Sequence, residues 1–153
     1  AICMTITGGA TDATDSVVNI PGILTGYKFQ TETVFEGVDP APTAAESGKA
    51  FIVPNIGATT ITLPAVAAGL TFKVLFSAQP SGDIELDCAG EAIFQGVIMG
   101  GANAASPALI TNRNTLVFSN LSIAIGDSVD ILCDGVNWHV RAYVADHTSI
   151  TFT

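Results

Sequence analysis

Acidic residues that alternate along one short segment are the first candidates for chemistry. Asp83, Glu85 and Asp87 are separated by apolar residues, so a strand here would present the three carboxylates on one face. Carboxylates grouped in this way can bind Ca²⁺ or hydrolyse glycosidic bonds. No calcium loop rich in Asn and Gly accompanies them, and the simpler interpretation is the solvated face of a strand.

The two histidines, His139 and His147, could act as metal ligands or general bases. Neither lies at motif spacing from a nucleophile, and neither GxSxG nor HExxH occurs. The three cysteines, Cys3, Cys88 and Cys133, are widely spaced and form no CxxC pair, so we interpret them as buried thiols. We therefore expect no catalytic, metal-binding or cofactor-binding residues, no cofactor and no enzymatic activity.

Three further aspartates, Asp127, Asp130 and Asp134, lie close together in the sequence. Asp127 follows a glycine and Asp134 precedes one, so both are expected to shape turns through side-chain hydrogen bonds. Asp130 is expected to face Arg141 across a hairpin, as an exposed ion pair of modest strength.

The segment Ser128–Val144 carries the strongest hairpin signal in the chain. Apolar and polar residues alternate on both sides of an Asp-Gly turn, which is typical of a half-buried antiparallel hairpin. The connection is either a two-residue loop at Gly135-Val136 or a four-residue loop at Asp134–Asn137. Both alternatives give the same inward pairs, namely Cys133 with Trp138, Ile131 with Val140, and Val129 with Ala142.

Short alternating segments, separated by turn residues, recur through most of the chain. They are Ala50–Pro54, Thr59–Leu63, Leu70–Ala78, Asp83–Cys88, Glu91–Met99, Thr115–Phe118, Ser122–Ile125 and Ser149–Phe152. No helical period of ten residues interrupts them, so we predict an all-β fold, an antiparallel, jelly-roll-like β-sandwich. The small residues of Gly100–Asn114 predict a long loop.

The chain divides into three parts by composition. Residues 1–36 are expected to form an N-terminal arm or extra strands, residues 37–48 a linker, and residues 49–153 the β-sandwich body. Two prolines and several small residues mark the linker, with one helical turn at Thr43–Glu46 as an alternative. The alternating segment Tyr27–Phe35 is either part of a docking arm or an integral strand of the sandwich.

Charge is scarce in this chain and its sign is acidic. Charged residues make up 12% of the sequence and the net charge is −9, whereas soluble proteins average roughly 25% charged residues. The five Lys and Arg residues are scattered, so we expect no nucleic-acid partner. No apolar run approaches the ~20 residues of a spanning helix, and we expect no membrane association and no signal peptide. Such a neutral surface favours a protein that is partly covered by neighbours.

A series of turn and strand motifs runs through residues 45–153. In order they are SGKAFI (47–52), TTITLPA (59–65), GLTFKV (69–74), SAQPSG (77–82), Gly96, GDSV (126–129), CDGVNW (133–138) and ITFT (150–153). Their order resembles a recurring pattern of tailed-bacteriophage virion proteins, in particular the small head-decoration, or cement, proteins. Residues 1–44 lie outside the resemblance.

The resemblance implies a non-catalytic viral capsid decoration protein, located on the outer surface of the virion. Its expected activity is adhesion between neighbouring capsomers. The implied partners are the major capsid protein and copies of the chain itself, as a homotrimer.

The alternative function is a tail-fibre or spike head module that binds host receptor glycans, followed by a lytic enzyme or a free carbohydrate-binding module. Tyr27, Trp138 and Tyr143 are the Tyr and Trp residues of the chain. Because Trp138 is expected to point inward, few aromatic rings remain for stacking on sugars.

Overall fold

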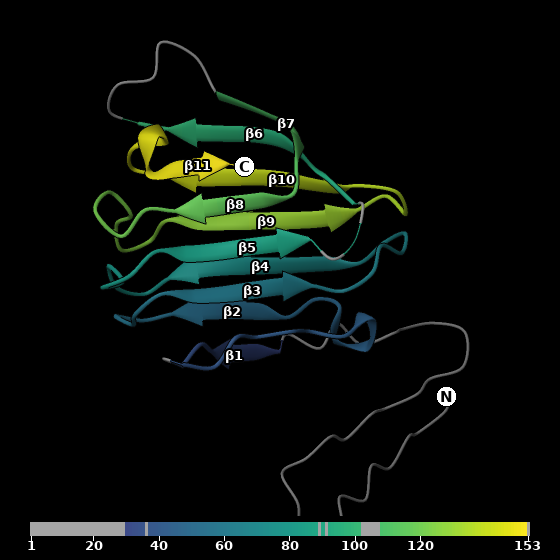
Figure 1. Ribbon diagram of the computed structural model, residues 1–153, viewed down its shortest axis with the longest axis horizontal. Coiled ribbons are helices and arrows are strands. Elements are labelled where there is room, and N and C mark those ends of the chain that lie inside the picture. The colour runs from purple at the N-terminus through teal and green to yellow at the C-terminus, as the bar shows by residue number, and fades with distance from the viewer. Residues whose placement is uncertain (1–29, 36, 89, 91, 102–107, 153) are drawn as a thin grey trace, which may run out of the picture.

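The computed structural model describes residues 30–35, 37–88, 90, 92–101 and 108–152. Within these residues, eleven strands form two sheets that pack face to face (Figure 1). The seven-stranded sheet has the order β1 (Thr31–Thr33), β2 (Ala50–Val53), β4 (Thr71–Phe76), β9 (Ser128–Cys133), β10 (Trp138–Val144), β6 (Phe94–Gly100) and β7 (Ala108–Arg113). The four-stranded sheet has the order β11 (Ile150–Phe152), β8 (Thr115–Phe118), β5 (Ile84–Cys88) and β3 (Thr59–Leu63).

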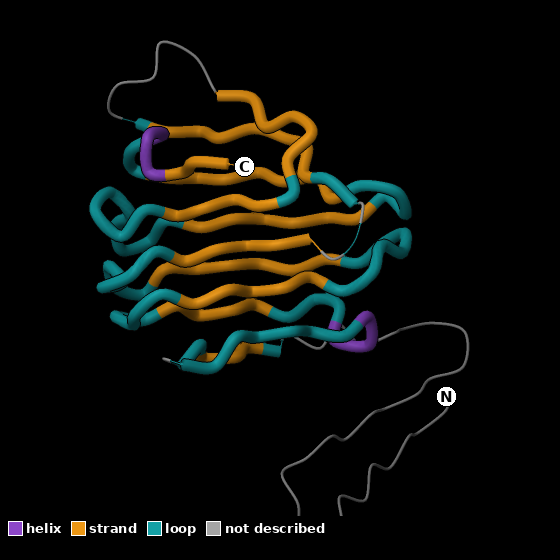
Figure 2. The backbone as a smooth tube through the Cα atoms, viewed as in Figure 1, coloured by secondary structure: helices purple, strands orange, loops and turns teal. Residues whose placement is uncertain are grey.

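Strands make up both layers, and two short 3-10 turns lie at their margins (Figure 2). These turns are η1 (Ala44–Glu46) and η2 (His147–Ser149), so the helical turn considered at Thr43–Glu46 is present in 3-10 form. In the described part of the chain, no helix is long and apolar enough to cross a membrane.

The prediction of an all-β sandwich is confirmed, but its sheets are mixed rather than purely antiparallel. Strands β2, β3, β4 and β5 alternate between the two sheets. Each sheet therefore receives every second strand of this region, and these strands run in the same direction. As a result β2 pairs in parallel with β4, and β3 with β5. The pairs β1/β2 and β6/β10 are parallel as well.

The hairpin of β9 and β10 has the predicted register. Cys133 lies opposite Trp138, and the two other predicted inward pairs are also formed. Asp134–Asn137 connects the strands. The Trp138 side chain is fully buried, with its ring 5.9 Å from that of Phe72 on β4. Alternation of the strands thus places the tryptophan in the core, as predicted.

The core lies between the inner faces of the two sheets. Phe76 of β4 and Phe118 of β8 meet across the layers, with ring centroids 5.4 Å apart. Both are fully buried, as are Ile84 and Leu86 of the smaller sheet. Burial of such side chains, at about 1.5–3 kcal/mol each, is the main stabilising contribution to the sandwich.

Two local predictions are wrong. The predicted strand at Ser122–Ile125 is a turn, because the backbone N–H groups of Ser122 and Ile123 both donate to the Ser119 carbonyl. The predicted loop at Gly100–Asn114 contains strand β7, which is stabilised by antiparallel pairing with β6. Pairing with a neighbour overrides the weak strand propensity of its small and polar residues.

The first described strand, β1, forms one edge of the seven-stranded sheet. Thr31–Thr33 pair with β2, and Val34 is buried in the core. These residues are integral to the sandwich, in agreement with the alternative considered for Tyr27–Phe35. The predicted short strands of residues 1–26 and the remainder of the predicted arm lie outside the described residues.

The predicted linker, residues 37–48, joins the two sheets at this side of the molecule. The Thr60 N–H donates to the Asp39 carboxylate (2.9 Å), and the Thr62 N–H donates to the Pro40 carbonyl (2.9 Å). These two bonds satisfy backbone donors of β3, the edge strand of the smaller sheet. The segment therefore covers an edge that would otherwise be open to pairing.

The acid stability of the protein should depend on Glu46. Hydrogen bonds from Lys49, and then from the Thr43 backbone and hydroxyl, lower the pKa of Glu46 to about 2. The folded state therefore favours the carboxylate relative to the unfolded chain, in which the pKa is about 4.3. This contribution to stability is complete above about pH 4.3 and is lost as the pH falls towards 2.

We expect Glu46→Gln to reduce the loss of stability between about pH 5 and about pH 3. Urea unfolding of both proteins at the two pH values measures this loss. Equal losses in wild type and Glu46→Gln would contradict the assignment.

Candidate functional site

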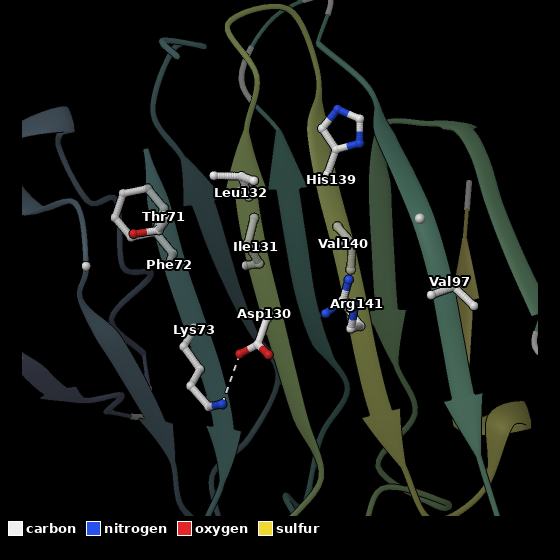
Figure 3. Close-up of a pocket in the computed structure, with 12 residues that line it drawn as sticks. Thr71, Phe72, Lys73, Val97, Asp130, Ile131, Leu132, His139, Val140 and Arg141 are labelled. Atoms are coloured by element: carbon white, nitrogen blue, oxygen red, sulfur yellow. Dashed lines mark hydrogen bonds and ion pairs between the residues drawn. The ribbon is translucent and has the colours of Figure 1, made fainter. Parts of the chain in front are cut away.

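A groove on the outer face of the seven-stranded sheet is the candidate functional site (Figure 3). It has a volume of about 600 Å³ and crosses β4, β9, β10 and β6. This volume falls within the range of small-ligand sites, about 300–1,000 Å³. The alternation that buries one face of these strands leaves their polar side chains on the opposite face, where the groove lies.

The strand register arranges the groove side chains in two rows that run across the strands. Residues that lie opposite one another on neighbouring strands share a row. The first row contains Thr71, Leu132 and His139. The second row contains Lys73, Asp130, Arg141 and Val97. Both rows are visible in Figure 3.

Asp130 occupies the centre of the second row, between two cations. The predicted register is confirmed, with Asp130 opposite Arg141, but the ion pair is formed with Lys73 instead. Lys73 Nζ donates to Asp130 Oδ1 at 2.9 Å. Lys73 lies on β4, the other neighbour of β9, so the correct partner depends on sheet order. Arg141 makes no ion pair with any described residue.

His139 lies at the rim of the groove and is held by the hairpin turn. Its Nε2 is 2.7 Å from Asp134 Oδ2. The other oxygen of Asp134 accepts the N–H groups of Val136 and Asn137, which confirms the predicted turn role. The hydrogen bond from His139 and these two backbone N–H groups lower the pKa of Asp134. Asp134 is therefore a carboxylate at neutral pH and orients the imidazole.

Asp127 also has the predicted turn role. Its carboxylate accepts the N–H of Ala124 (2.9 Å) and that of Ala145 (2.8 Å). It is buried and ties the loop before β9 to the end of β10. The groove does not include it.

The acidic segment at β5 lies on the other sheet, away from the groove. Glu85 and Asp87 point outward, as predicted, and Asp83 precedes the strand. Asp83 accepts the Asn120 N–H (2.9 Å), and Asp87 accepts the Thr115 hydroxyl (3.1 Å). Among the residues that the structure describes, no three His, Cys, Asp or Glu side chains are grouped so as to hold a metal ion.

The remaining candidates are also separate from the groove. His139 lies near the start of β10, whereas His147 lies in η2, which follows the end of that strand. His147 Nδ1 is 3.8 Å from Asp146 Oδ1. Cys88 and Cys133 are buried, free thiols, and burial raises the pKa of Cys88 to about 11. A thiol with this pKa remains protonated at neutral pH and is a poor nucleophile. Cys3 lies outside the described residues.

Sequence reasoning identified His139, Arg141 and Asp130 but missed the other groove residues. Thr71 and Lys73 alternate with core residues in their strand, as does Leu132, and this signal predicts only that they face outward. Their placement in one groove depends on the pairing of β4 with β9, which links residues about 60 positions apart. The groove offers donors, acceptors and, in Arg141, a cation that has no ion pair among the described residues, for binding a polar ligand.

No family model, curated protein or solved structure matches this chain.

Proposed function

We propose that this protein is a structural component of a tailed-phage virion, a decoration (cement) protein on the outer surface of the head. It binds the major capsid protein and stabilises contacts between capsomers, without catalysis. Surface complementarity, rather than turnover, is its activity. The low fraction of charged residues, 12%, supports the proposal because a surface with few charged groups is suited to being covered in an assembly.

The motifs that carry the phage resemblance lie on strands of the sandwich and on the turns beside them. Gly69, Gly126 and Gly135 have φ angles of 87°, 93° and 103°, a conformation that favours glycine. Each lies just before or after a strand of the seven-stranded sheet. These three glycines therefore have the turn roles that the motifs imply, and this supports the resemblance on which the proposal rests.

One observation carries the docking proposal: large apolar side chains are exposed just after β1, the first described strand. Phe35 is 65% exposed and Val38 is 57% exposed. They follow β1, which among the described strands pairs only with β2. An open strand edge flanked by exposed apolar residues is typical of a surface that another protein covers. We place the contact with the capsid here.

Removing these apolar side chains should weaken capsid binding. We expect Phe35→Ser with Val38→Ser, in the full chain, to reduce affinity for heads stripped of decoration by about tenfold or more, as for central interface residues. Co-sedimentation with stripped heads measures the affinity. The matched control is Leu121→Ser with Ile125→Ser, which changes two residues that are 83% and 75% exposed in the loop before β9. Equal effects of the two variants would contradict a docking surface at β1.

Self-association as a homotrimer is part of the proposal and rests on the resemblance. Light scattering of the purified protein tests it. A receptor-binding head of a tail fibre or spike is the second candidate, favoured by the groove on the outer face. Copy number separates the two functions, because a decoration protein covers the head in many copies and a fibre module is present in few.

A further inference from the structure

The groove presents a ladder of side chains across four neighbouring strands, three of them charged and the fourth apolar. Lys73, Asp130, Arg141 and Val97 lie on β4, β9, β10 and β6 at matching register positions. With strands about 4.8 Å apart, the ladder extends roughly 14 Å. This length exceeds what one small ion needs and suits an elongated ligand.

Arg141 is the cation of this ladder that has no ion pair among the described residues. Lys49 pairs with Glu32 and Glu46, and Lys73 pairs with Asp130. The Arg113 guanidinium lies over the Phe152 ring, 5.1 Å from its centroid. Arg141 has neither an ion pair nor an aromatic partner among the described residues, although the chain carries fourteen acidic residues.

An available guanidinium next to a paired carboxylate specifies the chemistry of the ligand. The planar N–H donors of Arg141 match a carboxylate group in two-point geometry. Asp130, Thr71 and His139 offer acceptors and donors on the same face. Leu132 is about half exposed and provides an apolar surface between them.

We propose that this groove is a binding site for a carboxylated saccharide. Arg141 receives the sugar carboxylate, and Asp130 and Thr71 bind hydroxyl groups. Leu132 and Val97 contact the apolar C–H faces of the rings. The proposal applies both to a head-decoration protein and to the head module of a tail fibre.

The position of the groove favours a saccharide over an acidic peptide. Extended peptides bind sheets mainly at edges, where backbone N–H and C=O groups are free. The groove lies instead over β4, β9, β10 and β6, each of which is paired on both sides. Their backbone groups are committed to neighbouring strands, so recognition depends on side chains. A ligand rich in hydroxyl groups makes better use of such a surface than a peptide backbone does.

The test is titration calorimetry of the full-length protein with a panel of uronic-acid and sialic-acid oligosaccharides. Each saccharide is compared with its methyl ester, which lacks the charge and is larger by one methyl group. We expect at least one acid to bind and its ester to bind roughly 10- to 100-fold more weakly, the usual range for a hydrogen-bonded charge. Arg141→Gln should weaken binding of the acid by a similar factor and leave binding of the ester unchanged.

Arg113→Gln is the matched control, since it removes one arginine from the same sheet outside the groove. It should leave the affinity for the acid unchanged. Melting temperatures establish that Arg141→Gln folds, with a change of about 2 °C or less expected for an exposed residue.

Failure of the whole panel to bind, equal binding of acid and ester, or full affinity in Arg141→Gln would overturn the proposal. A glutamate hexapeptide that binds as tightly as the best saccharide would overturn the choice of ligand class. None of these outcomes affects the capsid experiment, which uses a different surface.

Discussion

Trp138→Ala should lower the free energy of unfolding by about 3–5 kcal/mol, the usual cost of removing a large buried aromatic side chain. Trp138 is fully buried at the start of β10 and its ring contacts that of Phe72 on β4. Truncation leaves a cavity beneath the centre of the seven-stranded sheet, between strands that cannot collapse without breaking their ladders. Denaturant unfolding followed by circular dichroism measures the change. This signal does not rely on tryptophan fluorescence, which the variant has lost.

Two further variants distinguish the loss of stability caused by this cavity from the loss caused by removing other contacts of the hairpin. Trp138→Phe should cost much less, because an aromatic ring remains and the indole N–H, which has no partner among the described residues, is removed. Asp130→Ala should cost less than about 1 kcal/mol, since both side chains of its pair with Lys73 are nearly half exposed. A Trp138→Ala variant as stable as wild type would show that the assigned inner face of the hairpin is wrong.

Gly96→Ala should destabilise the protein by about 3 kcal/mol or more, at the upper end of the costs of overpacking. Gly96 pairs with Val140 where the parallel strands β6 and β10 meet. A Cβ atom at Gly96 would lie 1.8 Å from the Val140 carbonyl oxygen and 2.7 Å from its carbon. These are backbone atoms, so a rotamer change cannot relieve the clash and the two strands must separate.

Gly69→Ala is the control for a methyl group added without a clash. Gly69 has a φ of 87°, and a Cβ there would meet nothing within 4 Å. Gly69→Ala should therefore lower the free energy of unfolding only by the cost of placing an alanine in the left-handed conformation, about 1–2 kcal/mol. Chemical denaturation of both variants gives the comparison, and a Gly96→Ala cost no greater than that of Gly69→Ala would contradict the close approach of β6 and β10.

The two proposed surfaces are separate on the molecule. The docking surface lies at β1, at one edge of the seven-stranded sheet, whereas the groove lies mainly over β4, β9, β10 and β6 and extends towards β1 only as far as Gly48, just before β2. A protein held through the β1 edge would keep its groove open to solvent. Head attachment and saccharide binding are therefore compatible in one chain, and each can be removed by substitutions that leave the other in place.

The sequence by itself determined the features that depend on neighbours along the chain. Alternation in Ser128–Val144 determined which side chains of the hairpin face inward, because successive side chains of a strand point to opposite faces. The same pattern, together with the Asp-Gly turn, determined the register of β9 and β10. A shift of one residue would move the apolar side chains of one strand to the outer face. Turn roles of Asp127 and Asp134 followed from local side-chain hydrogen bonds.

Only the tertiary structure decided the features that depend on sheet order. Periodicity shows that Lys73 faces outward, but the ion pair with Asp130 exists because β4 lies beside β9, 57 residues further along the chain. The predicted Arg141 partner was the neighbour within the hairpin, the one neighbour that local sequence reveals. The parallel pairs arose because successive strands alternate between the sheets, and period-two patterns are the same for parallel and antiparallel neighbours. The groove is a product of these distant pairings, since its rows join side chains from four strands that only the assembled sheet brings together.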